Sequence, residues 1–133
     1  MKDVNEIIAY KHSAMIQTNA KNLTLVQRKV INALIYVIQK TGDQREYSVN
    51  TADLKKICGI TSVGNDELKK HLKALTQVTL EFNYLGKDKD KGWQVMVLLS
   101  GAELLPESNS ISFSFSPFSQ KKMLVNSSQT KNA

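Results

Sequence analysis

The sequence is poor in residues that build disulfides, metal sites and membrane spans. It holds one cysteine and two histidines among 133 residues, so Cys58 has no partner for an internal disulfide. His12 and His71 lie too far from it for the spacing of a metal site. No apolar run approaches the roughly 20 residues that cross a bilayer, and Asp3 and Glu6 stand where a signal peptide is apolar. These absences predict a cytoplasmic protein without membrane contact, in which Cys58 is a small buried hydrophobe.

Catalytic patterns are missing as well. His12 and His71 lie in unrelated segments, and no Ser, His and acid arrangement accompanies them. No glycine-rich loop of the P-loop or dinucleotide-binding type occurs. The sequence therefore predicts a protein that acts by binding, without catalysis, and that needs no cofactor or metal.

A basic surplus and enough apolar residues for one core are what the sequence does have. Eighteen Lys and Arg stand against twelve Asp and Glu, which gives a net charge of +6. Hydrophobic residues make up 41% of the chain, enough for a single domain of this length. A basic balance favours a polyanionic partner, of which DNA and RNA are the commonest.

The clearest predicted helix runs from Leu25 to Lys40. Thr24 and Gln27 form a capping box before it, and Gly42 supplies the left-handed residue that stops it. Apolar residues recur at helical spacing at Val26, Val30, Ala33, Leu34, Val37 and Ile38. Further isoleucines widen this stripe, which leaves two interpretations. The helix is either central to its own domain, or it also lines a protein-protein contact through Ile31, Ile35 and Ile38.

Two shorter helices are predicted next. After a brief strand over residues 47–49, Thr51 caps a helix that ends at Gly59, with Leu54, Ile57 and Cys58 pointing inward. Residues 60–64 form a turn. Asn65 opens the following helix, with Asp66 and Glu67 near the positive end of its dipole. Its buried stripe is expected at Leu68, Leu72 and Leu75.

Beyond Gln77 the period changes from 3.6 to 2, which is typical of strands. One strand carries Val78, Leu80, Phe82 and Tyr84 inward, and the charged turn GKDKDKG over residues 86–92 leads back into a second. The inward face of this returning strand is predicted at Trp93, Val95, Val97 and Leu99. Residues 101–109 are expected to be a loop. Ile111, Phe113 and Phe115 alternate with serines in a third strand, and Pro117 is expected to begin a last helix.

This order of elements predicts an α+β winged helix, that is, a helix-turn-helix followed by a β-hairpin wing and a third strand. We expect an N-terminal extension at residues 1–22, in which a short extended stretch or helical turn packs across the domain. The winged-helix domain is expected over residues 23–125, followed by a disordered tail over residues 126–133.

A helix enters the major groove when one face packs on its domain and the other offers donors to phosphates and bases. The candidate DNA-binding residues lie on the two short helices and on the wing: Lys55, Lys56, Asn65, Lys69, Lys70, His71, Lys73, Lys87, Lys89 and Lys91. Each lysine would act as a point charge that releases counterions. The alternative is an ordinary solvated helix face and a soluble turn, because Asp88 and Asp90 alternate with the wing lysines.

The segment KHSAMIQTNAKNLTLVQRKVINALIYVIQK, residues 11–40, resembles the opening of plasmid replication initiators of the Rep type, which carry two winged-helix domains. The family's Leu-Thr-Leu element and the Gln-Arg after it match Leu23, Thr24, Leu25, Gln27 and Arg28. Further matches are the helix with Leu54, Lys55, Lys56 and Ile57, the helix with Leu72 and Leu75, the hairpin through Trp93, and ISFSFSPF as the closing strand. The resemblance covers about residues 11–125 and falls on the first of the two domains.

This resemblance implies a protein that binds double-stranded DNA at the repeats of a plasmid origin, helps to open the duplex and recruits host replication proteins. It implies no nuclease or polymerase chemistry. In such initiators the first winged helix mainly supports homodimerisation and backbone contacts, while a second supplies much of the specific reading of the major groove. We expect the present chain to hold the first alone.

Two other functions fit the same fold. A winged-helix transcriptional regulator would share every contact and differ only in the DNA it occupies. A winged-helix protein-interaction module would not bind DNA, and Lys69 and Lys73 would then be ordinary surface groups. Only the DNA-binding functions predict a steep dependence of DNA affinity on salt.

Overall fold

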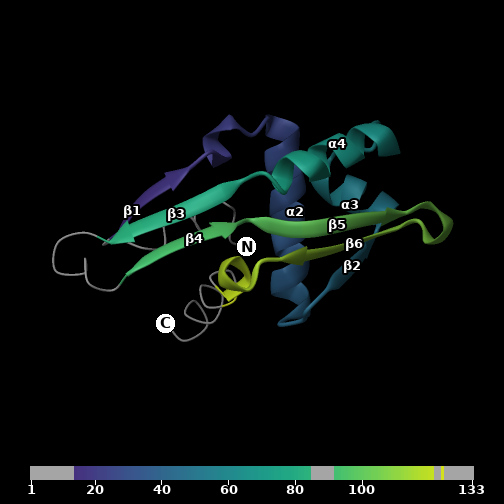
Figure 1. Ribbon diagram of the computed structural model, residues 1–133. Helices are drawn as coiled ribbons and strands as arrows, with labels where there is room; N and C mark the ends of the chain where they lie inside the picture. The colour runs from purple at the N-terminus through teal and green to yellow at the C-terminus, as the bar shows by residue number, and fades with distance from the viewer. Residues whose placement is uncertain (1–13, 85–91, 122–123, 125–133) are drawn as a thin grey trace.

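The computed structural model describes residues 14–84, 92–121 and 124. Within them the strands form two three-stranded antiparallel sheets, which extend in opposite directions from the middle of the molecule (Figure 1). The helix α2 (Leu25–Thr41) runs across the strands where the two sheets meet. The helices α3 (Thr51–Cys58) and α4 (Asn65–Leu75) lie together at one end, away from the hairpin of β3 and β4.

Local sequence explains both ends of α2. The Thr24 side chain accepts a hydrogen bond from the Gln27 backbone N–H, and the Gln27 side chain accepts one from Thr24 N–H, which confirms the predicted capping box. Gly42 follows the last helical residue with φ +96°, and its N–H donates to Ile38 O. A positive φ strains any side chain, so the predicted glycine stop is confirmed, one residue later than expected. With ψ −166°, Gly42 is not in the left-handed helical conformation that was predicted for it.

The helix-turn-helix begins with α3. Its N-cap is Asn50, whose side chain accepts from the Asp53 N–H at 3.1 Å, so the predicted cap at Thr51 was wrong by one residue. The helix ends at Gly59 in the left-handed conformation, as predicted. Leu54 and Cys58 are buried but Ile57 is 48% exposed, because eight residues with a single packed side bury only one stripe.

The helix α4 begins at Asn65 and buries Leu68, Leu72 and Leu75 as predicted. It packs against α2, as α3 does, and also contacts the sheet at β5. Full burial of a leucine side chain contributes about 2 kcal/mol of hydrophobic free energy. The leucine stripe therefore fixes which face of α4 turns away from the domain.

The wing is part of the sheet β1-β3-β4. Its strands are β1 (Ala14–Thr18), β3 (Thr79–Tyr84) and β4 (Trp93–Val97), and the predicted inward residues Leu80 and Phe82 are completely buried. The turn that joins β3 to β4 lies outside the described residues. A three-residue 3-10 helix, η1 (Ala20–Asn22), connects β1 to α2.

The second sheet has the order β2-β6-β5, with β2 (Tyr47–Asn50), β5 (Leu99–Leu105) and β6 (Ser110–Phe115). The predicted inward residues of β6, Ile111, Phe113 and Phe115, are all buried. After them, residues 117–121 form a helical turn that begins at Pro117, as predicted. Ser116 caps it by accepting from the Ser119 N–H at 3.2 Å.

Two predictions for residues 93–109 were wrong. Trp93, Val95 and Val97 are 59%, 47% and 37% exposed, and the buried residues of this segment are Met96, Leu98 and Leu99. The reason is register: Met96 pairs with the buried Leu80, and directly opposite residues share one face of a sheet. Residues 101–109, predicted to be a loop, instead form most of β5 and the 3-10 helix η3 (Pro106–Ser108).

Part of the predicted N-terminal extension belongs to the wing sheet. Over its whole length β1 pairs with β3, from Ala14 opposite Tyr84 to Thr18 opposite Leu80. The Asn19 side chain then makes two hydrogen bonds of 2.9 Å, donating to Gln77 O and accepting from the Thr79 N–H. Both contacts lie where α4 gives way to β3, so the chain before α2 fixes the root of the wing.

One core joins these elements. Buried residues of α2, α3, α4 and both sheets form a single cluster, within which Tyr47 stacks on Phe113 at 5.6 Å between ring centroids. None of the helices among the described residues is long and apolar enough to span a bilayer.

Candidate nucleic-acid interface

The outward face of α4 is basic. Lys69, Lys70 and Lys73 are all exposed, on the side away from the buried leucines, as the sequence predicted. Lys69 and Lys73 stand one turn apart and line a hollow of about 380 Å³ between α4 and β5. Lys70 is not in the wall of that hollow. The face therefore offers ammonium groups over a width greater than a single helix ridge.

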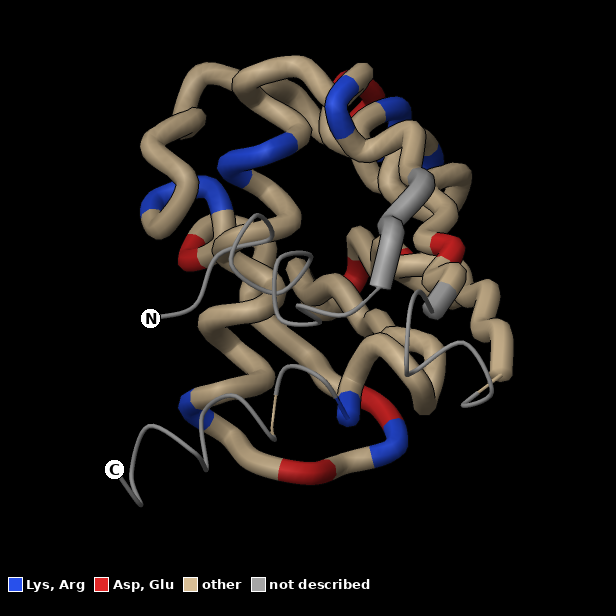
Figure 2. The backbone as a smooth tube through the Cα atoms, turned by 90° about the vertical axis from the view of Figure 1, so that its left-hand side faces the viewer, with Lys and Arg blue, Asp and Glu red and all other residues tan. Residues whose placement is uncertain are grey.

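Acidic residues partly neutralise the positive charge of this face. Asp66 Oδ1 lies 3.5 Å from Lys69 Nζ, with the two side chains 97% and 59% exposed. An exposed ion pair contributes at most about 1 kcal/mol, so a phosphate competes easily for this lysine. Figure 2 shows that Lys and Arg are spread over several elements, with Asp and Glu beside many of them. The positive charge is therefore not confined to α4.

A second basic group lies on α3. Lys55 Nζ donates to Asn65 Oδ1 at 3.0 Å, which links the end of α3 to the first residue of α4 across the turn. Lys56 is exposed beside it. The predicted residues Lys55, Lys56 and Asn65 are thus brought together in one place, next to the α4 lysines.

His71 was predicted on the polar face, and the structure corrects this. Its side chain is only 14% exposed, and neither ring nitrogen is open to water or hydrogen-bonded. Glu67 Oε1 lies 3.7 Å from Nε2. Position 71 follows Leu68 by three residues and precedes Leu75 by four, so it flanks the buried stripe. His71 therefore has no free face to offer to DNA.

The remaining predicted sites divide into two groups. Lys87, Lys89 and Lys91 lie outside the described residues. Ile31, Ile35 and Ile38, expected at a homodimer contact, have no exposed surface at all. The chain's own core covers α2 on several sides, because α3, α4 and β2 all contact it. The isoleucines therefore hold the domain together, and a second copy has no access to them.

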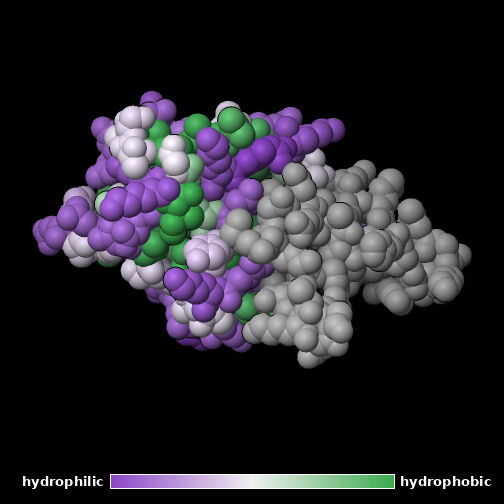
Figure 3. All heavy atoms as spheres, turned by 180° about the vertical axis from the view of Figure 1, so that it is seen from behind, coloured by the Kyte–Doolittle hydropathy of each residue, from purple (hydrophilic) through white to green (hydrophobic). Residues whose placement is uncertain are grey.

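Apolar side chains do reach the surface elsewhere. Figure 3 shows hydrophobic residues in patches between hydrophilic ones on the face opposite to that of Figure 1. The large exposed apolar residues in the described ranges are Leu25, Ile57, Trp93, Val95, Val97, Leu105 and Phe118. Three of them alternate along β4, an edge strand of the wing sheet as far as it is described. The sequence did not predict this apolar strip.

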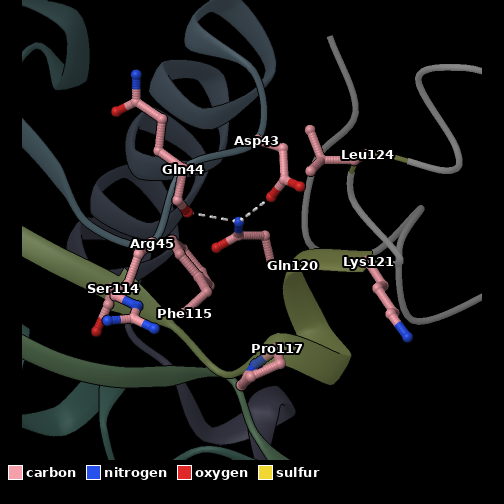
Figure 4. Close-up of a pocket in the computed structure, with 9 residues that line it drawn as sticks. All are labelled: Asp43, Gln44, Arg45, Ser114, Phe115, Pro117, Gln120, Lys121 and Leu124. Atoms are coloured by element: carbon pink, nitrogen blue, oxygen red, sulfur yellow. Dashed lines mark hydrogen bonds between the residues drawn. The ribbon is translucent and has the colours of Figure 1, made fainter.

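A larger hollow of about 750 Å³ lies where the helical turn at 117–121 meets the loop after α2 (Figure 4). Gln120 Nε2 donates to Asp43 Oδ1 at 2.8 Å and to Gln44 O at 2.7 Å across it. In the same loop, Tyr47 Oη donates to Gly42 O at 2.7 Å and accepts from the Gln44 N–H. Burial raises the Tyr47 pKa, and the Asp43 carboxylate adds to the rise against the Gln44 hydrogen bond. The Gln120 contacts tie the helical turn at 117–121 to the loop after α2.

The described residues contain no cluster of three or more His, Cys, Asp or Glu that could hold a metal ion. Cys58 is buried and free, as expected. Its thiol lies 3.6 Å from Lys29 O, and burial raises its pKa to about 11 despite the nearby Lys29 charge. A thiol with so high a pKa is a weak nucleophile at neutral pH.

These elements stand in the order of a winged helix: a helix-turn-helix of α3 and α4, the hairpin of β3 and β4, and the further strand β6. A family model described as initiator replication protein, WH1, matches residues 8–131 of the chain. No curated protein and no solved structure shows a significant match. The chain belongs to the initiator replication protein family, and it is a WH1 domain, the N-terminal winged-helix domain of a plasmid replication initiator.

Proposed function

We propose that this domain binds double-stranded DNA at the repeats of a plasmid origin, with the outward face of α4 in the major groove. The observation that carries the proposal is the pairing of a fully packed leucine stripe with three exposed lysines on the opposite side of one helix. The major groove is about 12 Å wide and admits a helix of this kind. The proposal includes no catalytic step and no cofactor.

The lysines supply affinity more than sequence selection. An ammonium group is a point charge without the planar fork that reads guanine, so Lys69, Lys70 and Lys73 are suited to phosphates. Lys55 and Lys56 extend the same contact along the backbone from α3. In this proposal the domain works in the cytoplasm, positions an initiator on the duplex, and leaves other surfaces for host replication proteins.

The test is a salt series of binding to a random duplex, compared between the wild type and the triple variant Lys69→Ala, Lys70→Ala, Lys73→Ala. The slope of log affinity against log salt should flatten by up to about three units, one for each lysine that meets a phosphate. The matched control removes the same charge from exposed lysines outside the helix-turn-helix, as Lys21→Ala, Lys29→Ala, Lys40→Ala. Equal slopes in the two triple variants would refute a specific role of α4. If the wild type does not bind the duplex, the remaining function is that of a protein-interaction module.

We infer further that the domain forms a homodimer through the apolar strip of β4, made of Trp93, Val95 and Val97. As far as the sheet is described, β4 lies at its edge, and its alternating exposed apolar side chains give a second copy an apolar surface to bury. Val95→Lys should shift the sedimentation equilibrium from dimer to monomer with the fold intact by circular dichroism. Leu25→Lys, at an apolar residue exposed on α2, is the control. An unchanged oligomeric state in Val95→Lys would overturn the inference.

A further inference from the structure

A polar hollow of about 380 Å³ lies beside the start of α3. Its volume is roughly ten times that of a water molecule in the liquid, so a small anion fits with part of its hydration. Three parts of the chain meet there: the first turns of α3, the turn before α4, and the loop after η3. The wall consists of Asn50, Thr51, Ala52, Lys55, Lys56, Thr61, Asn65 and Asn109. Two of these residues are cationic and none is acidic, which fits an anionic ligand.

Within this wall, the Thr51 hydroxyl gives the strongest indication of a ligand. Thr51 is only 6% exposed, and its Oγ1 has no hydrogen-bond partner in the described part of the protein. Its backbone N–H donates to Asn109 O at 2.7 Å, which ties the loop after η3 to the helix start. A buried hydroxyl without a partner is costly and rare, so it calls for an explanation. Thr51 lines the hollow, so a ligand oxygen there would supply the missing acceptor once the Thr51 side chain rotates towards it.

The two lysines of the wall are not neutralised. Lys55 Nζ has a neutral partner, Asn65 Oδ1 at 3.0 Å, and an ammonium group has three N–H donors, so donors remain. Neither Lys55 nor Lys56 forms an ion pair with a described acidic residue, whereas Lys69 on α4 lies 3.5 Å from Asp66. The positive end of the α3 dipole adds to the same field.

We propose that this hollow binds a phosphate group, with Lys55, Lys56 and the Thr51 hydroxyl as its donors. Phosphate oxygens accept several hydrogen bonds at once. They also carry the negative charge that would neutralise the two lysines. The group comes either from the DNA backbone beside α4, which rests on the proposed function, or from a free phosphate ion. In the first case the hollow sets where along the backbone the helix-turn-helix docks.

The experiment titrates inorganic phosphate into the ¹⁵N-labelled chain and follows the amide signals of Thr51, Ala52 and Asn109. Sodium chloride at equal ionic strength is the reference. Thr51→Val keeps the shape and removes the hydroxyl, while Thr51→Ser restores it. Lys55→Gln removes one charge, and Lys40→Gln is its control, since α2 ends on the far side of the molecule from α4 (Figure 1). We expect phosphate affinity to fall about tenfold in Thr51→Val and in Lys55→Gln, and to stay unchanged in the control.

A purely structural role of Thr51 predicts something different. Loss of an unpaired buried hydroxyl should leave the melting temperature of Thr51→Val unchanged or raise it, so weaker phosphate binding would not reflect unfolding. A lower melting temperature with unchanged phosphate affinity would overturn the proposal. So would wild-type signals that respond to phosphate no more than to chloride.

Titration with a short random duplex separates the two sources. If duplex affinity falls with phosphate affinity in Lys55→Gln and Thr51→Val, the hollow holds a DNA phosphate. If the duplex shifts the α4 signals but binds these variants as well as the wild type, the DNA-binding function stands and the hollow is not part of it, which overturns the DNA source. If phosphate binds but the duplex does not, the hollow is confirmed for free phosphate and the proposed function fails.

Discussion

Cys58 shows how one side chain responds to packing between two helices. It lies in α3 with its thiol against the Lys29 carbonyl of α2, and only 6% of its surface is exposed. Burial disfavours the thiolate, because a charge in the interior loses its hydration. The folded protein therefore holds the Cys58 proton up to a pKa of about 11, whereas the free thiol has a value of 9.0.

This difference makes stability depend on alkaline pH. Because the folded pKa lies above the unfolded value, the contribution of Cys58 is complete below pH 9 and is lost as the pH rises towards 11. Urea unfolding should therefore show a fall in unfolding free energy over this range. Cys58→Ala, which has no thiol to titrate, should lose less over the same range, and Tyr47, whose pKa is also raised, should account for part of the remainder. An identical fall in both proteins would show that Cys58 titrates alike in the folded and unfolded chain.

Single residues also show how much of the candidate interface could be predicted from the sequence. Helical spacing placed Lys69 and Lys73 on the outer face of α4 correctly, because the three leucines define the inner one. The same spacing puts His71 beside the stripe, but its polar character suggested the outer face. The role expected for Ile35 failed for another reason: periodicity shows that a face is apolar, not whether the chain's own core or a partner covers it.

At the scale of elements, the helices could be predicted and one strand could not. Capping residues and glycine stops are local signals, and they fix α2 and α3 to within about a residue. Residues 95–99 are all apolar, so alternation alone does not choose between their two faces. The choice is made by the pairing of β4 with β3, a contact between segments far apart in sequence. The strand β5 was missed because Gly101 and Pro106 are typical of a loop.

The attachment of β1 to the wing is another long-range feature, and it leads to a test at the scale of elements. The Asn19 side chain donates to Gln77 O and accepts from the Thr79 N–H. Asn19→Ala therefore removes both hydrogen bonds, and water must replace them. We expect a loss of about 1–2 kcal/mol in unfolding free energy by urea denaturation. Asn22→Ala is the control, because Asn22 is exposed and its side chain makes no hydrogen bond within the described residues, and it should change stability by less than about 0.5 kcal/mol. Equal losses in the two variants would mean that Asn19 does not anchor the wing.

At the scale of the molecule, the two sheets behave as one body because they share a core. Leu80, Phe82 and Met96 of the wing sheet belong to the same buried cluster as α2, α3, α4 and the second sheet. The strands β4 and β5 follow each other almost directly, separated only by the buried Leu98, and the Leu98 N–H donates to Val78 O. Unfolding one sheet therefore exposes the apolar surface of the other, and such coupling favours a single cooperative transition.

Trp93 makes this coupling measurable, because it is the sole tryptophan of the chain and lies on the wing sheet. Its indole Nε1 donates to Glu81 Oε2 at 2.7 Å, so its fluorescence reports the pairing of β3 with β4. Far-ultraviolet circular dichroism reports mainly α2, α3 and α4. At one protein concentration the urea unfolding curves from fluorescence and circular dichroism should coincide. Phe82→Ala should shift both curves to lower urea by the same amount, because it lowers the free energy of unfolding by about 3–5 kcal/mol. A fluorescence change at lower urea than the circular dichroism change would show a wing that unfolds by itself, and the single core would then not transmit the wing's loss to the helix-turn-helix.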